Sequence, residues 1–522
     1  MATEHGEQGG VRMAELVATL SYAADLGLGQ PMEHCLRQTV IALRLAELAG
    51  ADQADREATY YLGLLVNSYC HADASEQARW FGDDISMKAD SYDMLVMSTP
   101  QMVAHLLRSI GSHGSTRNRV RRVATLPTAG WSEMSTWLLT HTQLGSDFAA
   151  KVGLDDHVGQ ALLNAYEQWD GKGPRHVRGK EIPLASRLVA LASRTEIMAR
   201  RGPETAAEAV RRHRGAIFDP ELADLMMRNW PGVLDDLSGA ATWDAVVSAE
   251  PALQRWVSGA ELDDVLAEMA DLVDLKSPYF AGHSRGVATL AAEAARISGL
   301  SEGDQATVRR AGYLHDLGRL GVSNAIWDKP GPLGDTEREK AHLHPWLTDK
   351  MLARVSGLGP SREIAARHHE RLDGSGYPRG LTAASLTPLD RLLAAADVAH
   401  AMTEPRPHRE ALSANEVQRQ LQAEVRAGRL DGDAVAAVLE AAGHRAPTRR
   451  EGPAGLTVRE VEVLALLARG LATKEIARRL GTTPKTAGNH VEHIYTKLGV
   501  GSRAAATLWA TQHGLVGAYE VG

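Results

Sequence analysis

Cysteine is nearly absent from this chain. Only Cys35 and Cys70 occur among its 522 residues, which is too few for a disulfide framework and favours a reducing compartment. Long apolar runs are missing too: none reaches the roughly eighteen residues that a membrane-spanning helix needs, and residues 1–10 are polar, without a signal-peptide core. We therefore expect a cytoplasmic protein with no membrane partner.

Aromatic residues and positive charge are also scarce. Aromatics make up 5% of the chain, whereas apolar residues as a whole make up 44%, and the richness in Ala and Leu favours helices. The net charge of −8 argues against a protein that coats nucleic acid along its whole length, although an average can hide a local basic module. The length suits roughly three or four domains.

Apolar residues recur at three- and four-residue spacing through most of the chain, which predicts an all-α fold. We expect two tandem helical domains followed by a small helix-turn-helix domain of four helices. The predicted segments are a disordered N-terminus (1–10), a first helical domain (11–228), a connector (229–260), a second helical domain (261–443), a linker rich in Pro, Gly and Arg (444–455) and a C-terminal domain (456–522).

The two large helical domains look like copies of one another. Residues 165–173 (AYEQWDGKG) lie over residues 368–376 (HHERLDGSG), so that one Glu, one Asp and two glycines are shared. The differences fall on residues that could bind metal. From the second copy to the first, His368 becomes Ala165, His369 becomes Tyr166, His315 becomes Val66, Asp316 becomes Asn67 and Asp397 becomes Ser193. We expect a first copy with no metal centre; the alternative is chance similarity between two regions rich in Ala and Leu.

The second copy contains a set of histidines and aspartates suited to metal binding. They are His283, His315, Asp316, His344, His368, His369 and Asp397. Imidazole and carboxylate suit Fe, Mn, Zn or Ni. Adjacent helical residues point about 100° apart, so each adjacent pair can reach two neighbouring metals, and Asp316 can bridge them. So many ligands are too many for one ion, and we expect two cations that activate a water for attack on a phosphate.

Other histidines lack such a context. A lone histidine most often lies on the surface or in a core position where its polar atoms are satisfied. We therefore interpret His34, His105, His113 and His141 as non-ligands.

These motifs resemble the HD-GYP family of cyclic di-GMP phosphodiesterases over roughly residues 271–442. The matching pieces are Lys276–Ser284, His315–Arg319, His344-Pro345, His368–Pro378 and Asp397–Met402. The resemblance implies a helical fold with two or three metals, often Fe or Mn, held by the metal-binding set given above. It implies that Tyr377 lies in a substrate-binding loop, that Arg406 and Arg409 hold substrate phosphate, and that Asp316 and Arg319 serve catalysis.

Two residues depart from that family. Arg319 stands where Lys is usual, which keeps the charge but changes its reach. Tyr279 stands where members with a third metal carry Glu, so we expect two metals. His342 and His344 compete for one ligand role; the resemblance favours His344, which Pro345 follows, and leaves His342 a structural role. The complete ligand set favours turnover of a cyclic dinucleotide; a nucleotide sensor without turnover and a phosphohydrolase of another nucleotide are the alternatives.

The C-terminal domain has the helix start and stop signals that are typical of a helix-turn-helix. Thr457 and Glu460 predict a capping box, Gly481 stops a short amphipathic helix, and Thr483-Pro484 opens the next helix. From residue 452 onward, eight Lys and Arg face five Asp and Glu, so this region is locally basic. We expect the helix opened by Thr483 to read the major groove of DNA. The alternative is a small helical bundle with a solvated basic face.

Residues 456–514 resemble the DNA-binding domain of LuxR-type regulators almost throughout. The motifs are Leu-Thr-x-Arg-Glu-x-Glu-Val-Leu, Lys-Glu-Ile-Ala, Thr-x-x-Asn-His and Lys-Leu-Gly-Val-x-Ser-Arg. The resemblance implies a homodimer formed through the last helix. It also implies contacts to double-stranded DNA by Lys474, Lys485, Thr486, Asn489, His490 and Lys497. Gly488 departs from the larger residue that is common there, at a cost of roughly 1 kcal/mol of helix propensity against Ala.

Overall fold

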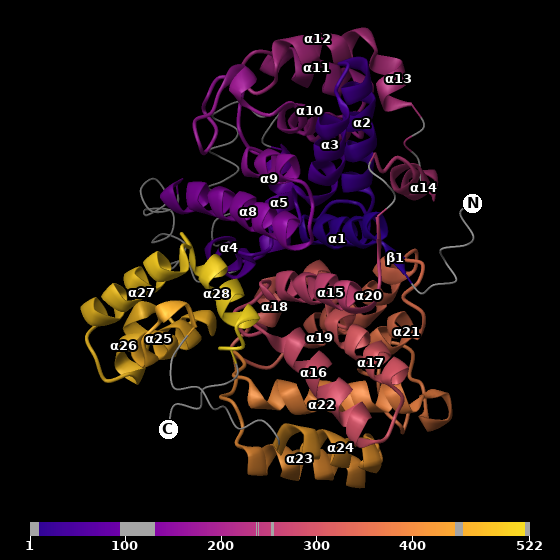
Figure 1. Cartoon of the computed structure of the whole chain (residues 1–522), viewed down its shortest axis with the longest axis vertical. Helices are drawn as coiled ribbons and strands as arrows, with labels where there is room; N and C mark the ends of the chain where they lie inside the picture. Colours follow the sequence, from indigo (N-terminus) through magenta and orange to yellow (C-terminus); the bar gives the residue numbers. More distant parts are fainter. Residues whose placement is uncertain are drawn as a thin grey trace. The chain divides into compact units, whose positions relative to one another are not determined.

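The computed structural model describes residues 10–93, 131–235, 237, 240–251, 255–443 and 453–516. Nearly all of the predicted disordered N-terminus, most of the predicted linker, and both His105 and His113 lie outside the described residues. The chain divides into two compact units, Met1–Leu262 with Arg354–Gly357, and Asp263–Ala353 with Leu358–Gly522. Helices supply almost all regular structure of the described residues, so the predicted all-α class is confirmed (Figure 1). Among these helices, none combines the length and apolar character required to cross a bilayer.

The first unit is built on α2, α3 and α10, which pack against one another through buried aliphatic side chains. Its helices are α1 (Met13–Gly27), α2 (His34–Leu48), α3 (Gln53–Leu65), α4 (Ala74–Phe81), α5 (Asp84–Asp93), α8 (Trp131–Lys151), α9 (Asp156–Leu163), α10 (Leu184–Ala199), α11 (Pro203–His213), α12 (Pro220–Arg228), α13 (Trp230–Leu234) and α14 (Ala240–Ser248). The predicted connector 229–260 therefore contains helical structure. It also contains β2 (Trp256–Val257), which pairs antiparallel with β1 (Val11–Arg12).

The helices of the second unit before residue 444 include α16, which packs against α17, α22 and α24. They are α15 (Gly259–Asp274), α16 (His283–Ile297), α17 (Glu302–Leu314), α18 (Asn324–Trp327), α19 (Asp335–His342), α20 (His344–Leu352), α21 (Pro360–Ala366), α22 (Pro388–Thr403), α23 (Ala414–Arg426) and α24 (Gly432–Gly443). Gly312 lets α17 lie close to α16, because a Cβ there would come within 2.5 Å of the Cα of Ala288. This close packing brings the C-terminal end of α17 to the N-terminal end of α16.

The predicted duplication is visible in the backbone. Glu33 precedes α2 and Gly282 precedes α16, and both have φ 79° and ψ 4°, a left-handed conformation that is rare for a residue with a side chain. Gly63 and Gly312 occupy the same step of the following helix, where each approaches the preceding helix closely. Two Ala/Leu-rich regions that were similar by chance would not share such a detail.

The shared Glu of the two aligned loops has the same task in both copies. The carboxylate of Glu370 accepts hydrogen bonds from the backbone N–H groups of Arg379 and Leu381, both at 2.8 Å. That of Glu167 accepts them from Arg175 and Val177, at 2.7 and 3.0 Å. The Glu-x-x-Asp-Gly-x-Gly pattern is therefore a loop scaffold, and it is independent of metal binding.

The C-terminal domain has four α-helices within residues 453–516: α25 (Val458–Ala468), α26 (Thr473–Arg479), α27 (Pro484–Leu498) and α28 (Arg503–Gln512). The predicted capping box is confirmed, since Thr457 Oγ1 accepts from Glu460 N–H and Glu460 accepts from Thr457 N–H. Thr483 caps α27 as predicted. The domain has its own apolar core, centred on residues such as Leu464, Ile476 and Ile494.

Candidate functional site

The predicted metal ligands of the second copy come from five places in the chain and lie together. His283 and His344 are the first residues of α16 and α20, His315 and Asp316 follow α17, His368 and His369 follow α21, and Asp397 lies within α22. Helix ends can present side chains inward without breaking a helix. All are buried except His369, which is half-buried.

Two glycine positions are needed for this convergence. A Cβ at Gly318 would lie 2.0 Å from the carbonyl oxygen of His344, so only glycine lets the turn after Asp316 approach α20. Thr348 fixes that approach, because its hydroxyl donates to the carbonyl of His315 and accepts from the N–H of Gly318. A Cβ at Gly376 would clash with the backbone of Glu370, so glycine also lets the following loop fold back over the two histidines.

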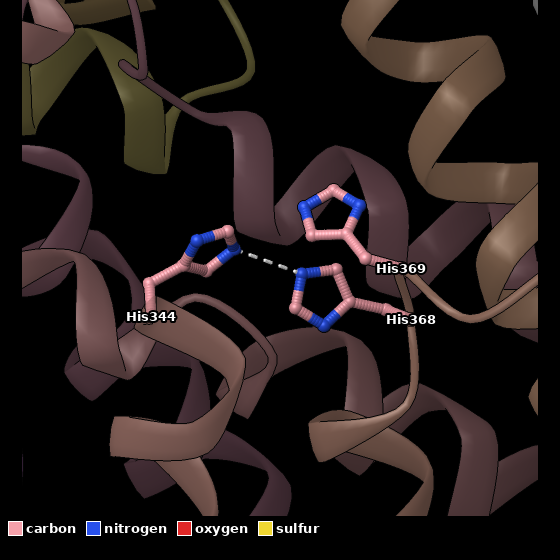
Figure 2. A group of neighbouring side chains, drawn as sticks. All are labelled: His344, His368 and His369. Carbon is pink, nitrogen blue, oxygen red and sulfur yellow. Dashed lines mark hydrogen bonds between the residues drawn. The ribbon is translucent and has the colours of Figure 1, made fainter. Parts of the chain in front are cut away.

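The ligands form two clusters with Asp316 between them. His344, His368 and His369 make one cluster (Figure 2), and His283, His315 and Asp397 make the other; the donor atoms in each lie within 4.8 Å of one another. Asp316 Oδ1 is 3.4 Å from His344 Nε2 and 3.7 Å from His368 Nε2. Asp316 Oδ2 is 2.9 Å from His315 Nε2 and 3.4 Å from His283 Nε2. One carboxylate therefore offers one oxygen to each cluster.

The imidazole rings are held in the tautomer that metals require. Nδ1 of His315, His344 and His368 lies 2.6–2.7 Å from a backbone carbonyl one turn earlier. A carbonyl can only accept, so Nδ1 carries the proton and Nε2 keeps its lone pair for a cation. These Nε2 atoms point at Asp316.

The charge states of the cluster of His344, His368 and His369 and of Asp316 also suit a metal. His283 differs, because the effect of burial, which would lower its pKa, is outweighed by Glu404, Asp316 and Asp397, which raise that pKa well above its usual range. Burial lowers the pKa of His344 to about 4 and holds the pKa values of His368 and His369 well below their usual range, which keeps these rings neutral. Burial alone would raise the pKa of Asp316, but Arg319 and His315 outweigh it, so that this pKa lies well below its usual range. Neutral imidazole and ionised carboxylate are the metal-binding forms.

The residues present fit a metal group. Nε2 of His283, Nε2 of His315 and both oxygens of Asp316 are buried and make no hydrogen bond of good geometry. Converging buried atoms of this kind are costly unless something binds them, and imidazole and carboxylate donors suit Fe or Mn.

Two of the three residues expected to bind substrate phosphate or orient the substrate lie beside this centre. The guanidinium of Arg406 is 5.3 Å from the centre of the Phe280 ring, and it donates to Glu404 and to the carbonyl of Tyr279. The Tyr377 ring stacks on His342 at 3.8 Å and lies 4.7 Å from His369, and a structural role for His342 stays a prediction.

The third of these residues, Arg409, is engaged differently. Its guanidinium donates to the backbone carbonyls of Ala401, Met402, Glu404 and Glu410. These bonds hold the segment after α22 in place, and a phosphate contact by Arg409 stays a prediction.

The predicted catalytic residue Arg319 is buried against the carboxylate of Asp316. Its Nη2 lies 2.7 Å from Asp316 Oδ2, and its guanidinium carbon lies 4.2 Å from the centre of the Phe280 ring. Nε and Nη1 have no hydrogen-bond partner. Arg319 therefore has donors left for an anionic ligand beside Asp316.

The first copy fills the equivalent place with other contacts. The Tyr166 hydroxyl donates to the carbonyl of Val66, and Asn67 donates to Cys35 Sγ. His34 pairs with Glu196, and His141 with Asp73. Within the described part of the first unit, no group of three His, Cys, Asp or Glu donors converges as a metal site would require.

Most of the predicted DNA-contacting residues lie on the helix-turn-helix. Lys485, Thr486 and Asn489 are exposed on the first half of α27, His490 is half-buried there, and Lys474 is exposed on α26. Lys497 lies at the other end of α27, where its ammonium group is 2.6 Å from Glu460 and 3.1 Å from the carbonyl of Gly455. Lys497 therefore stabilises the N-terminal end of α25 by contacting Glu460 of its capping box. A DNA contact by Lys497 stays a prediction.

Comparison with known proteins agrees with this architecture. A family model described as HD domain matches residues 268–434, and one described as bacterial regulatory proteins, luxR family, matches residues 454–510. The 3'3'-cGAMP-specific phosphodiesterase 3 of Vibrio cholerae is 30% identical over 407 residues, which cover 77% of this chain and 88% of that protein. The chain belongs to the HD-GYP phosphodiesterase family.

Two further proteins are similar to this chain. A cyclic di-GMP phosphodiesterase of Thermotoga maritima is 34% identical over 155 residues, 28% of this chain and 42% of that protein. A solved structure of a cyclic GMP-AMP specific phosphodiesterase of Vibrio cholerae superposes with a TM-score of 0.56 at 26% identity, over 84% of this chain and 99% of that one. The present chain combines an HD-GYP domain with a luxR-family domain.

The sequence alone did not single out three residues of the HD-GYP site. Glu404 accepts from His283 Nδ1, His400 packs its ring 5.5 Å from that of His283, and Phe280 lies under both Arg319 and Arg406. Phe280 lies inside a family motif, so its place was a usable signal. His400 likewise lies inside the Asp397–Met402 motif. Glu404 carried no such signal, because its position depends on how the end of α22 meets the start of α16.

Proposed function

We propose that the HD-GYP domain hydrolyses a cyclic dinucleotide at a centre of two divalent cations, with Fe or Mn as the expected metals. The observation that carries this proposal is Asp316, whose two oxygens face two separate ligand clusters. When bound, the cations supply Lewis acidity and an activated water for attack on phosphorus. A protein that only senses a nucleotide has no need of a complete, buried ligand set with a bridging carboxylate.

The chain's own side chains bind and orient the phosphodiester. Both guanidinium groups lie against the Phe280 ring, which gathers the positive charges of Arg319 and Arg406 in one place. There they offset the negative charge on the phosphoryl oxygens. Asp316 holds Arg319 in place through their 2.7 Å contact. Tyr377 stacks on His342 and lies 4.7 Å from His369 at a tilt of 34°, so its ring is held beside the cluster of His344, His368 and His369, where the substrate would bind.

The substrate class follows from the relatives, and two members of it are candidates. The sequence motifs favour cyclic di-GMP, whereas the relative aligned over 407 residues is named for 3'3'-cGAMP. Both are 3',3'-linked cyclic dinucleotides with a guanine, so the same ligand set would suit hydrolysis of either.

A direct test compares substrates on the metal-loaded protein. The full chain, reduced and supplied with Fe(II) or Mn(II), is incubated in parallel with cyclic di-GMP, 3'3'-cGAMP and cyclic di-AMP, and linear dinucleotide is measured by chromatography. We expect product from at least one guanine-containing substrate. Binding of all three without product would support a sensor, and hydrolysis only of other phosphate esters would support a different phosphohydrolase.

We further propose that the luxR-family domain binds double-stranded DNA through α27 as part of a homodimer that regulates transcription. The exposed Lys485, Thr486 and Asn489 at the start of α27 support this, since the N-terminal residues of a recognition helix meet the base edges. A protein that works on DNA in this way operates in the cytoplasm of a bacterium. Sedimentation of the full chain tests the dimer.

Lys485→Ala is expected to weaken DNA binding by roughly 1–3 kcal/mol, because it removes an exposed cation from the start of α27. Binding is measured by mobility shift on a random-sequence duplex pool at low salt. Glu492→Ala, which removes an exposed acid from the same helix, is the matched control and should not weaken binding. Unchanged shifts for both Lys485→Ala and His490→Ala would contradict this groove assignment.

Gly488→Ala is expected to stabilise the C-terminal domain by up to about 1 kcal/mol, because Ala has the higher helix propensity. The added methyl group fits, since the nearest atom to a Cβ at Gly488 is Thr473 Cγ2 at 3.9 Å. Thermal unfolding followed by circular dichroism measures the effect. The control is Gly481→Ala, at a positive φ of 62° outside the helices, which should destabilise instead. A loss of stability in Gly488→Ala would show that the position is constrained by more than propensity.

A further inference from the structure

Glu404 lies where three functional side chains meet, although it is not among the metal-binding residues. It is the residue that ends α22, and it is buried. Its Oε2 is 2.9 Å from His283 Nδ1 and 2.9 Å from Arg406 Nη2. Its Oε1 is 3.2 Å from His400 Nδ1. One carboxylate thus joins a metal ligand to a phosphate-binding arginine.

The bond to His283 differs from those of the neighbouring ligands. His315, His344 and His368 each donate Nδ1–H to a backbone carbonyl, whereas His283 donates to a carboxylate. A carboxylate at Nδ1 makes Nε2 a stronger electron-pair donor to a metal, and it fixes the rotation of the ring. His283 Nε2 faces Asp397 at 3.2 Å and Asp316 at 3.4 Å.

The surrounding residues are arranged to admit this carboxylate. His400 occupies the space over Gly286, where a Cβ would come within 1.8 Å of its Nε2. The first copy has a different arrangement at the corresponding helix positions: Arg37 replaces Gly286, Glu196 replaces His400, and Arg200 replaces Glu404. There, Glu196 pairs with His34 and with both arginines. In the second copy, the carboxylate that contacts His283 also contacts Arg406, the arginine proposed to bind the substrate phosphate.

We propose that Glu404 is a positioning residue that orients His283 for metal binding and holds Arg406 for the substrate phosphate. This inference rests on the proposed phosphodiesterase function. His283, His400 and Glu404 have donor atoms within 4.8 Å of one another. A cation there is disfavoured, because Glu404 Oε2 already contacts His283 and the Arg406 guanidinium, whose positive charge would repel the cation. Glu404 therefore acts through its two partners rather than on the reacting atoms.

Two variants separate its two tasks. Glu404→Ala removes both contacts, so we expect metal affinity to fall about 10- to 100-fold and metal content to drop toward one ion per chain, since only the cluster of His283, His315 and Asp397 loses support. Glu404→Gln keeps an oxygen that can accept from His283 but loses the ion pair with Arg406. It should retain most of the metal while KM for the cyclic dinucleotide rises.

The measurements are Mn(II) titration by calorimetry, metal content by mass spectrometry, and kcat and KM of the full chain. Glu440→Ala, at an exposed position on α24, is the matched control. Wild type that binds no metal or cleaves no cyclic dinucleotide would refute the proposed function. An active, metal-binding wild type together with a folded Glu404→Ala of unchanged affinity, kcat and KM would refute the role of Glu404. If Glu404→Ala does not fold, Glu404→Gln alone decides. A KM equal to that of wild type would refute the proposed role of Glu404 in holding Arg406. A fall in metal affinity of about 10-fold or more would refute the expectation that Gln still supports His283.

Discussion

Asp316→Asn is expected to reduce cyclic dinucleotide hydrolysis by roughly a thousandfold or more, because the bridging position needs two anionic oxygens. In the wild type, Oδ1 faces His344 and His368, and Oδ2 faces His283 and His315. Asparagine offers one neutral oxygen and turns an NH2 group toward one of the two clusters. Metal content, measured by mass spectrometry, should fall together with activity.

Asp335→Asn is the control for that change. Asp335 is on α19 with a side chain that is 95% exposed, so the same loss of charge occurs far from any buried donor. We expect wild-type activity from it. If Asp316→Asn retained two metals and full turnover, a bridging role for this carboxylate would have to be abandoned.

Arg319→Met is expected to reduce turnover by about 10²- to 10³-fold while leaving the bound metal in place. The reason is that Arg319 contributes donors beside Asp316 but no lone pair for a cation. Removing its charge frees Asp316 Oδ2, so metal affinity should stay level or rise. Measuring kcat, KM and metal content together separates this pattern from the loss of a ligand.

Arg319→Lys tests one of the two positions at which the chain departs from the family motif. Lysine keeps the charge but has a single donor group and a different reach. We expect activity within about tenfold of wild type if charge dominates. Arg296→Met, at an exposed position on α16, should leave turnover unchanged. Loss of metal in Arg319→Met would show instead that Arg319 supports the ligand frame.

The sequence was sufficient to predict the all-α class, because periodic apolar residues and clear helix caps act locally. Capping by Thr457 and Thr483 is an example, since each cap bonds a group three residues away. The gathering of the proposed ligands was predictable for a related reason: adjacent pairs such as His315-Asp316 must project together wherever the fold places them. The glycines shared by the two aligned Glu-x-x-Asp-Gly-x-Gly loops were also visible in the sequence.

What could not be predicted depends on contacts between distant segments. The direction of each Asp316 oxygen is set by Gly318 and Thr348, which dock the turn against α20. Likewise Arg409 has the residue type for a phosphate contact, yet the nearby carbonyls bind its guanidinium. No spacing in the sequence encodes which of two partners a long cationic side chain reaches.

The position of Gly286 has a consequence for engineering the first copy. Restoring histidines and aspartates at positions 66, 67, 165, 166 and 193 would leave the contacts that support His34 different from those that support His283. Arg37 stands at the helix position that corresponds to Gly286, and its guanidinium is bound to Glu196, the carboxylate that His34 also uses. A working design would have to replace Arg37 by glycine and transfer the carboxylate from position 196 to position 200. The two copies thus differ in the residues that support the first histidine as well as in the proposed ligands. A design that reversed only the ligand substitutions would leave that second difference in place.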